Sequence, residues 1–372
     1  MISNSSMYSK LVVFSPVLAA AASYVINMLA AYGLPSPEDY SKYLQLQAWA
    51  VYFGAVSALC FVDLKLSPNG HKYNVFRLFG LSIVASLVLT IMTLLFGLIS
   101  DNFLFYLTVS ITGFLYAIFR GLLMSALVLR ISKIPVITRI IRGGVLILLG
   151  GATVLFLSES SPKEFMAIQA LAVVIPILIY IPRIIYFSLK NIFKLSKLIL
   201  NIDRDRIIRR NISYIVDMIH TPLFLMSIAG LSLIVELSWM IYLIGLALPI
   251  AFILNQMVGE RARFKFGLVD LEIIKKVFNS KRNLIKTVLL SFLLFYTLST
   301  IFIGLNVYGL IESEKTIAMI VFLQICFICI SSLSGLVISK SGLEFIDLLI
   351  NFVVTTVLIV IIQFDMPAVL QV

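Results

Sequence analysis

Charged residues are scarce in this sequence. Only 13% of its 372 residues are Asp, Glu, Lys or Arg, whereas 61% are hydrophobic, and the mean hydropathy is +1.07. An average soluble domain has about a quarter of its residues charged. The composition therefore excludes a soluble globular enzyme.

Cysteine is also scarce, and recognisable catalytic motifs are missing. Cys60, Cys326 and Cys329 all lie in apolar runs, which argues against a disulfide framework and against a zinc site. The sequence has no phosphate-binding Gly-rich loop, no HExxH motif and no long hydrophilic loop of the kind that membrane glycosyltransferases use. We therefore expect no enzymatic activity, no bound metal and no cofactor.

Apolar stretches of membrane-spanning length are what the sequence has in abundance. A helix needs about 20 apolar residues to cross about 30 Å of hydrocarbon. Eleven stretches qualify, at 11–32, 43–62, 78–100, 103–128, 140–157, 166–188, 212–234, 238–258, 284–305, 316–339 and 343–363. The sequence predicts an all-α polytopic membrane protein with about 11 (10–12) transmembrane helices. The short polar breaks at 100–102 and 236–238 are either loops or kinks.

Lysine and arginine are distributed unevenly between the loops on the two sides of the predicted membrane. Every second loop is strongly basic, whereas the opposite set has only Lys42, Lys163 and Lys315. Cytoplasmic loops retain positive charge, so we expect the N-terminus in the cytoplasm. Arg139 and Arg142 are assigned in this way to the inner loop before the fifth span. The net charge of +11 then reflects topology and anionic lipid, and nucleic acid is not needed as a partner.

A long basic segment at 191–210 divides the chain. It is amphipathic at helical spacing and separates six predicted spans from five. We expect a six-helix bundle at 1–190, a linker helix on the cytoplasmic interface at 191–210, and a five-helix bundle at 211–372. Two pseudo-repeated bundles joined by a cytoplasmic linker are typical of transporters.

Two arginines interrupt apolar spans. A charge inside the bilayer costs about 2.5–3.5 kcal/mol, so Arg120 and Arg183 are candidates for cations in a cavity. Arg183 follows Pro176 and Pro182, which would bend its helix. The alternative for both is that the side chain extends to the inner interface from a span that ends nearby.

Other polar residues inside the spans are candidates for ion coupling or for lining a cavity. Asp217 and His220 lie one helical turn apart and would suit a proton relay or a cation site. Alternatively, Pro222 kinks this helix, and His220 then bonds a freed carbonyl. Asn27, Gln47 and Asn255 either line a cavity or make hydrogen bonds between helices.

Glycines gather in the fifth span, at positions 143, 144, 150 and 151. Small residues let helix backbones approach one another closely in membranes. We therefore expect these glycines to pack against a neighbouring helix.

Two segments carry a resemblance to a known family. One is LPSPEDYSKY at 34–43, which is followed by an apolar span to Asp63; the other is FLYAIFR at 114–120, with Arg130, Arg139 and Arg142 downstream. These segments resemble the first outer turn and the fourth helix of polysaccharide (O-antigen type) flippases of the multidrug/oligosaccharidyl-lipid/polysaccharide exporter superfamily. The chain departs from the family in having Ser41 where the turn usually has glycine, and in having fewer spans than usual.

The resemblance implies a function in polysaccharide biosynthesis. It implies that the chain moves an oligosaccharide linked to undecaprenyl pyrophosphate across the bacterial cytoplasmic (inner) membrane, by alternating access between the two bundles. Arg120 and Arg183 would offset the pyrophosphate charge, and Asp217 with His220 would sense ion binding. Expected partners are the lipid-linked glycan, membrane lipids and other polysaccharide-assembly membrane proteins. The alternatives are a small-molecule or drug cation antiporter of the same architecture, a membrane glycosyltransferase or polymerase, and a membrane scaffold that transports nothing.

Overall fold

The part of the chain that the computed structural model describes is all-helical. It covers residues 3–58, 74–129, 131, 133–157 and 160–192, and singly 208, 212, 215, 219 and 222. The predicted second bundle and nearly all of the predicted linker lie outside these residues. Six helices follow one another in the described part: α1 (Ser3–Gly33), α2 (Pro37–Ser57), α3 (Val75–Ile99), α4 (Phe103–Val128), α5 (Lys133–Phe156) and α6 (Pro162–Ile192).

Five of these helices are long and apolar enough to cross a membrane. In α1 and α6 the qualifying segments are Ser15–Gly33 and Pro162–Tyr180, and in α3, α4 and α5 the whole helix qualifies. Exposed apolar side chains cover the outer face of α3: Val84, Leu87, Val88, Ile91, Met92, Leu95, Phe96, Leu98 and Ile99. Such a face suits contact with lipid chains rather than water. The described part is thus that of a multi-pass helical membrane protein.

Helix α2 differs from the predicted second span. It begins at Pro37 rather than at residue 43, so it includes Glu38, Asp39 and Lys42, and it is not among the five apolar segments. It packs mainly on α4, with further contacts to α6, α3 and α1. A helix that packs on other helices can carry polar side chains that hydrogen-bond to its neighbours.

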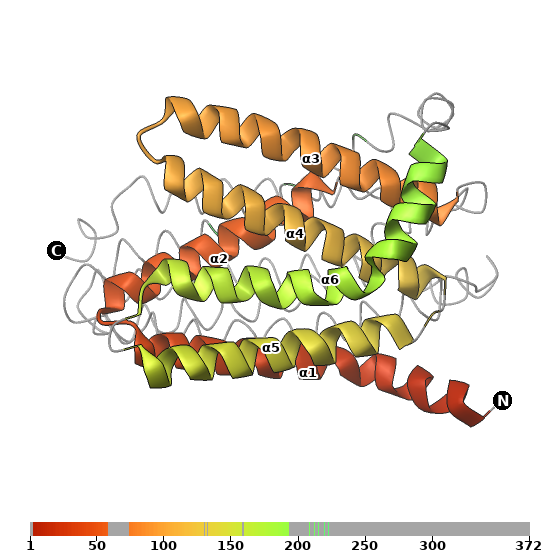
Figure 1. The fold of residues 1–372 in the computed structure, drawn as a ribbon, viewed down its shortest axis with the longest axis horizontal. Coiled ribbons are helices and arrows are strands. Elements are labelled where there is room, and N and C mark those ends of the chain that lie inside the picture. Colours follow the sequence, from red (N-terminus) through yellow and green to blue (C-terminus); the bar gives the residue numbers. More distant parts are fainter. Residues whose placement is uncertain are drawn as a thin grey trace, which may run out of the picture.

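The polar break at 100–102 separates two helices and is not a kink. Helix α3 ends at Ile99, α4 begins at Phe103, and the two helices pack against each other after the turn (Figure 1). Tyr106 lies against Gly97, where an added Cβ would meet the tyrosine Cβ at 2.7 Å. This close approach brings the two helices together directly after the turn.

Helix α5 begins seven residues earlier than the predicted fifth span. Arg139 and Arg142, which the charge pattern assigned to an inner loop, therefore lie within the helix. Arg139 is only 4% exposed and donates from Nη1 to Ser15 Oγ of α1 at 2.5 Å. The helix continues through both arginines because neighbouring helices supply polar partners for them.

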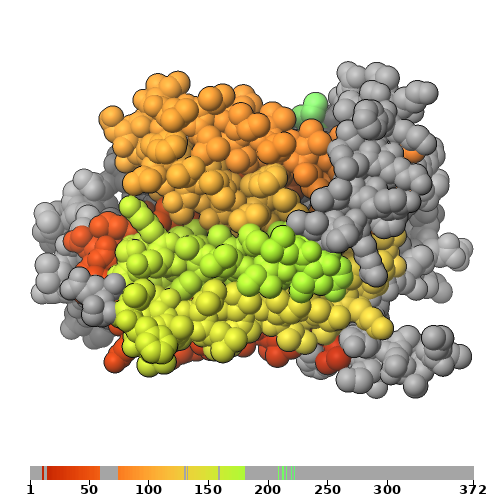
Figure 2. Space-filling model, viewed as in Figure 1, coloured from red at the N-terminus to blue at the C-terminus, as the bar shows by residue number. Residues whose placement is uncertain are grey.

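The helices form two groups that α6 joins. Helix α1 packs mainly on α5, whereas α4 packs on α2 and α3, and the direct contacts of α1 with α2 and of α4 with α5 are few. Figure 1 shows α1 and α5 on one side, α3 and α4 on the other, and α6 between them, with its last turns bent towards the start of α3. Pro176 and Pro182 lie in α6 and give a physical cause for this bend. The side chains of α6 fill the space between α4 and α5 on one face of the molecule (Figure 2).

Glycines allow the closest helix crossings. A Cβ at Gly54 of α2 would lie 2.6 Å from the carbonyl oxygen of Gly113 in α4 and 2.7 Å from Tyr116 Cβ. In α5, Gly143 and Gly150 pack against Ala22 and Ile26 of α1, as the sequence predicts. At Gly144 and Gly151 an added Cβ would meet no described residue within 4 Å, so the described helices make no close crossing there.

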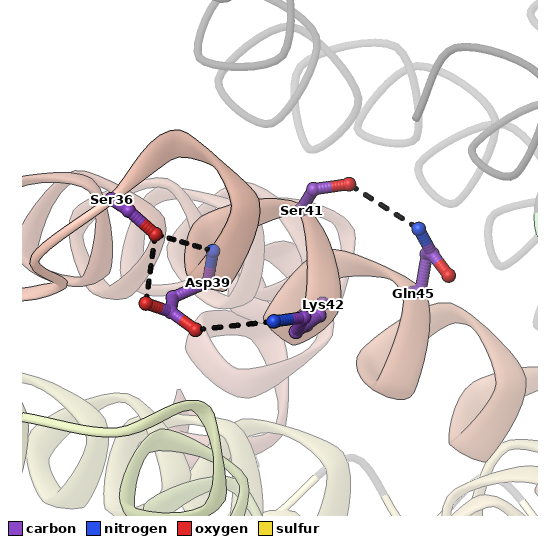
Figure 3. A network of polar contacts seen from close by, with 5 residues as sticks. All are labelled: Ser36, Asp39, Ser41, Lys42 and Gln45. Carbon is purple, nitrogen blue, oxygen red and sulfur yellow. Dashed lines mark hydrogen bonds and ion pairs between the residues drawn. The ribbon is translucent and has the colours of Figure 1, made fainter. Parts of the chain in front are cut away.

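Helix α2 begins with a side-chain cap at Ser36 (Figure 3). Ser36 Oγ accepts a hydrogen bond from the Asp39 backbone N–H at 3.1 Å and donates to Asp39 Oδ2 at 2.8 Å. Lys42 Nζ lies 3.6 Å from Asp39 Oδ1, and Gln45 donates to Ser41 one turn further on. The cap fixes the first turn of α2 and thereby the direction in which the helix enters the bundle.

Replacing Ser36 by alanine is expected to destabilise the protein by about 1 kcal/mol, because the Asp39 N–H loses its acceptor. Thermal unfolding in detergent measures the effect. The Ser36→Asn variant keeps a side-chain oxygen and should remain close to wild type. Equal losses in the two variants would contradict the role of the cap.

Candidate functional site

A chain of hydrogen bonds runs through the described helices and joins one side chain from each of five of them. We call Asn27, Tyr43, Tyr116, Arg142 and Gln169 the polar chain. Arg142 Nη2 donates to Tyr116 Oη at 3.3 Å, and Tyr116 Oη donates to Gln169 Oε1 at 2.9 Å. Gln169 Nε2 donates to Tyr43 Oη at 3.1 Å, and Tyr43 Oη donates to Asn27 Oδ1 at 3.2 Å. The polar chain thus links α5, α4, α6, α2 and α1 in that order.

The polar chain lies away from the helix ends. Helix rise places Asn27, Tyr43 and Gln169 about 9–11 Å from the end of the bundle that holds the turns after α1, α3 and α5. By the same measure Tyr116 and Arg142 lie about 20 Å from that end, near the middle of α4 and α5. Tyr43 and Gln169 are completely buried, and Asn27 is 3% exposed. These side chains therefore serve as hydrogen-bond partners for one another in an apolar interior.

Arg142 is the charged member of the polar chain. On α5 the exposed residues Ile140, Leu148 and Leu155 share one face, and at about 100° per residue Arg142 lies roughly opposite that face. Its guanidinium carbon is 5.7 Å from the ring centre of Tyr116 and 5.9 Å from that of Phe119. Both distances are within the range of cation–π attraction. The guanidinium is therefore held against α4, on the inner side of α5.

The guanidinium of Arg142 is only partly hydrogen-bonded within the described residues. Its Nε–H is buried and makes no hydrogen bond within the described residues. A buried unsatisfied donor on a charged group is expensive, at about 1–3 kcal/mol or more. Because this N–H is already removed from water, binding a further acceptor would add little to the cost of desolvating the guanidinium.

Carboxylates are absent from the interior of the six described helices. The acidic residues in this part of the chain, Glu38, Asp39, Asp101 and Glu164, all lie in or beside the turns at one end of the bundle. Asp39 is already engaged by Ser36 and Lys42. Within the described residues Arg142 accordingly has neutral partners and no acidic one.

The structure describes the side chains of some of the predicted site residues and not those of others. Asn27 belongs to the polar chain, and Arg120 is half-buried on α4 one helical turn after Tyr116, which places both on one face. Gln47 is half-buried on α2. Arg183 lies in α6, but its side chain is outside the described residues, as are Asp217, His220 and Asn255. The roles of Arg120 and Arg183 remain predictions.

Four members of the polar chain were not among the predicted site residues: Arg142, Tyr116, Gln169 and Tyr43. A signal for Arg142 was present, because position 142 lies inside the predicted span 140–157 and was nevertheless counted with the basic loop. No comparable signal marked the two tyrosines and the glutamine, because their partners are far apart in the sequence. Gln169 and Tyr43, for example, are separated by 126 positions.

Comparison with known proteins gives no relative for this chain. No protein-family model matches it, and neither a curated protein nor a solved structure is significantly similar to it. The arrangement of the side chains is therefore the basis for assigning a function.

Proposed function

We propose that the protein is a flippase for a lipid-linked oligosaccharide that carries a pyrophosphate, the undecaprenyl pyrophosphate-linked unit of polysaccharide biosynthesis. In this proposal the glycan headgroup passes through a hydrated interior while the lipid tail stays in the bilayer. The two bundles rock to open the interior to one side of the membrane and then to the other.

The observation that carries the proposal is the positive charge of Arg142 near the middle of the bundle, which no acidic side chain among the described residues compensates. A guanidinium at this depth is costly unless an anion or water accompanies it. Its planar donors match a phosphate oxygen pair. A passing pyrophosphate would supply the missing negative charge for part of the transport cycle, and water would solvate the group otherwise.

The other predicted cations fit the same proposal. Arg120 lies on the face of α4 that also carries Tyr116, about 6 Å further along the helix. Arg183 follows the two prolines of α6. We propose that both arginines receive the headgroup at stages before or after Arg142, and that Asp217 with His220 senses the coupling ion.

Reconstitution tests the proposal. Purified protein in vesicles should make a pyrophosphate-linked oligosaccharide lipid accessible to a glycan-modifying reagent added outside, and an uncharged lipid-linked analogue should move far more slowly. Equal movement of both lipids would contradict the role of the cation. Uptake of a soluble cation without lipid movement would favour the antiporter, and a change in glycan length without movement would favour the polymerase.

A further inference from the structure

The hydrogen bonds of the polar chain have a fixed direction. Arginine can only donate, so Tyr116 Oη must accept from Arg142 and use its own proton on Gln169 Oε1. The amide of Gln169 is then oriented with its nitrogen towards Tyr43, which in turn donates to Asn27. Each donor and acceptor assignment agrees with the one before it. Successive hydrogen bonds in such a chain polarise one another and so strengthen each other.

The polar chain also links the two groups of helices to each other. The Arg142–Tyr116 bond joins α5 to α4, and the Tyr43–Asn27 bond joins α2 to α1. These two helix pairs have few direct contacts with each other. Gln169 connects the two crossings from α6, which packs on both groups.

We propose that Tyr116 and Gln169 are positioning residues, which hold the Arg142 guanidinium in one orientation so that its free donors meet the anion. This inference rests on the proposed function. Tyr116 contributes the one acceptor that the guanidinium has within the described residues. Gln169 acts through Tyr116, because it takes the tyrosine proton and so keeps the oxygen available to Arg142.

Inorganic pyrophosphate is a suitable probe of this site in the purified full-length protein. It should raise the thermal unfolding temperature of the wild type in a saturable way. Tyr116→Phe should raise the half-saturating pyrophosphate concentration about tenfold, the loss expected for one hydrogen bond to a charged group. Gln169→Met, which removes the acceptor of the tyrosine proton, should shift it in the same direction by a smaller factor.

A matched control and a double variant separate positioning from general structural damage. Tyr106→Phe makes the same change on the same helix, at a tyrosine that contacts Phe96 and Phe105 through its ring, and should bind pyrophosphate as the wild type does. In an Arg142→Lys background, which lacks the planar fork, Tyr116→Phe should cause little further loss. A purely structural role would give equal losses in both backgrounds.

The outcomes distinguish this inference from the proposed function. If pyrophosphate stabilises the wild type but Tyr116→Phe behaves like Tyr106→Phe, the positioning role is wrong and the flippase proposal stands. If pyrophosphate does not stabilise the wild type at all, the anion site fails and the positioning role fails with it.

Discussion

Replacing Arg142 by glutamine is expected to lower the rate of lipid-linked oligosaccharide movement by at least about tenfold. The variant keeps a polar side chain of similar length, but it removes the positive charge and the paired donors that would meet the pyrophosphate. A charge-assisted hydrogen bond is worth about 1.5–3 kcal/mol, which corresponds to roughly 10- to 150-fold in rate or affinity. The vesicle assay measures this loss directly, and glycan export in a flippase-null strain measures it in cells.

Two control variants test whether the loss of movement comes from the charge and the planar shape of the Arg142 side chain. Lys133→Gln removes a positive charge from the exposed start of the same helix and should leave movement close to wild type. Arg142→Lys keeps the charge but loses the planar fork, so it should retain an intermediate rate. Wild-type movement by Arg142→Gln, at equal amounts in the membrane, would remove the main support for the proposed function.

The second large effect is expected at the crossing of α2 and α4. Gly54→Ala would place a methyl group 2.6 Å from the Gly113 carbonyl oxygen and 2.7 Å from Tyr116 Cβ, so the two helices would have to move apart. Overpacking of this kind costs about 1–3 kcal/mol. Because Tyr116 lies at the same contact, we expect both a lower unfolding temperature and slower movement of the lipid-linked oligosaccharide.

Gly151→Ala is the matched control for this prediction. Among the described residues an added Cβ there meets nothing within 4 Å, and alanine favours the helix more than glycine by about 1 kcal/mol. The unfolding temperature should therefore stay the same or rise. A loss of stability in Gly151→Ala as large as that in Gly54→Ala would contradict the close crossing.

Hydropathy located the six helices of the described part, although α2 and α5 begin earlier than it placed them. Ser100, Asp101 and Asn102 interrupt two strongly apolar runs, so the pattern marked the position of the short turn between α3 and α4, although it allowed a kink there as well. The start of α5 was misplaced because arginine counts as a loop residue in a hydropathy scan. Arg139 is instead buried against Ser15 of α1, a contact that only the packing of the helices creates.

The polar chain was harder to predict than the helices. Asn27 was singled out because an amide inside a span is unusual. A tyrosine inside a span is usually interpreted as an apolar or interfacial side chain. Tyr43 and Tyr116 form hydrogen bonds only because α6 brings Gln169 between α2 and α4. Such convergence depends on how the helices are arranged and leaves no periodic signal in the sequence.

Thiol accessibility at position 142 tests most directly whether Arg142 faces a hydrated interior. In a chain whose native cysteines are replaced by alanine, Arg142→Cys should react with an anionic, membrane-impermeant thiosulfonate at least about tenfold faster than Ile140→Cys, since only a hydrated thiol ionises readily. Position 140 is 54% exposed and lies about 3 Å along α5 on roughly the opposite face, so depth is matched. Faster reaction at position 140 than at position 142 would contradict the account.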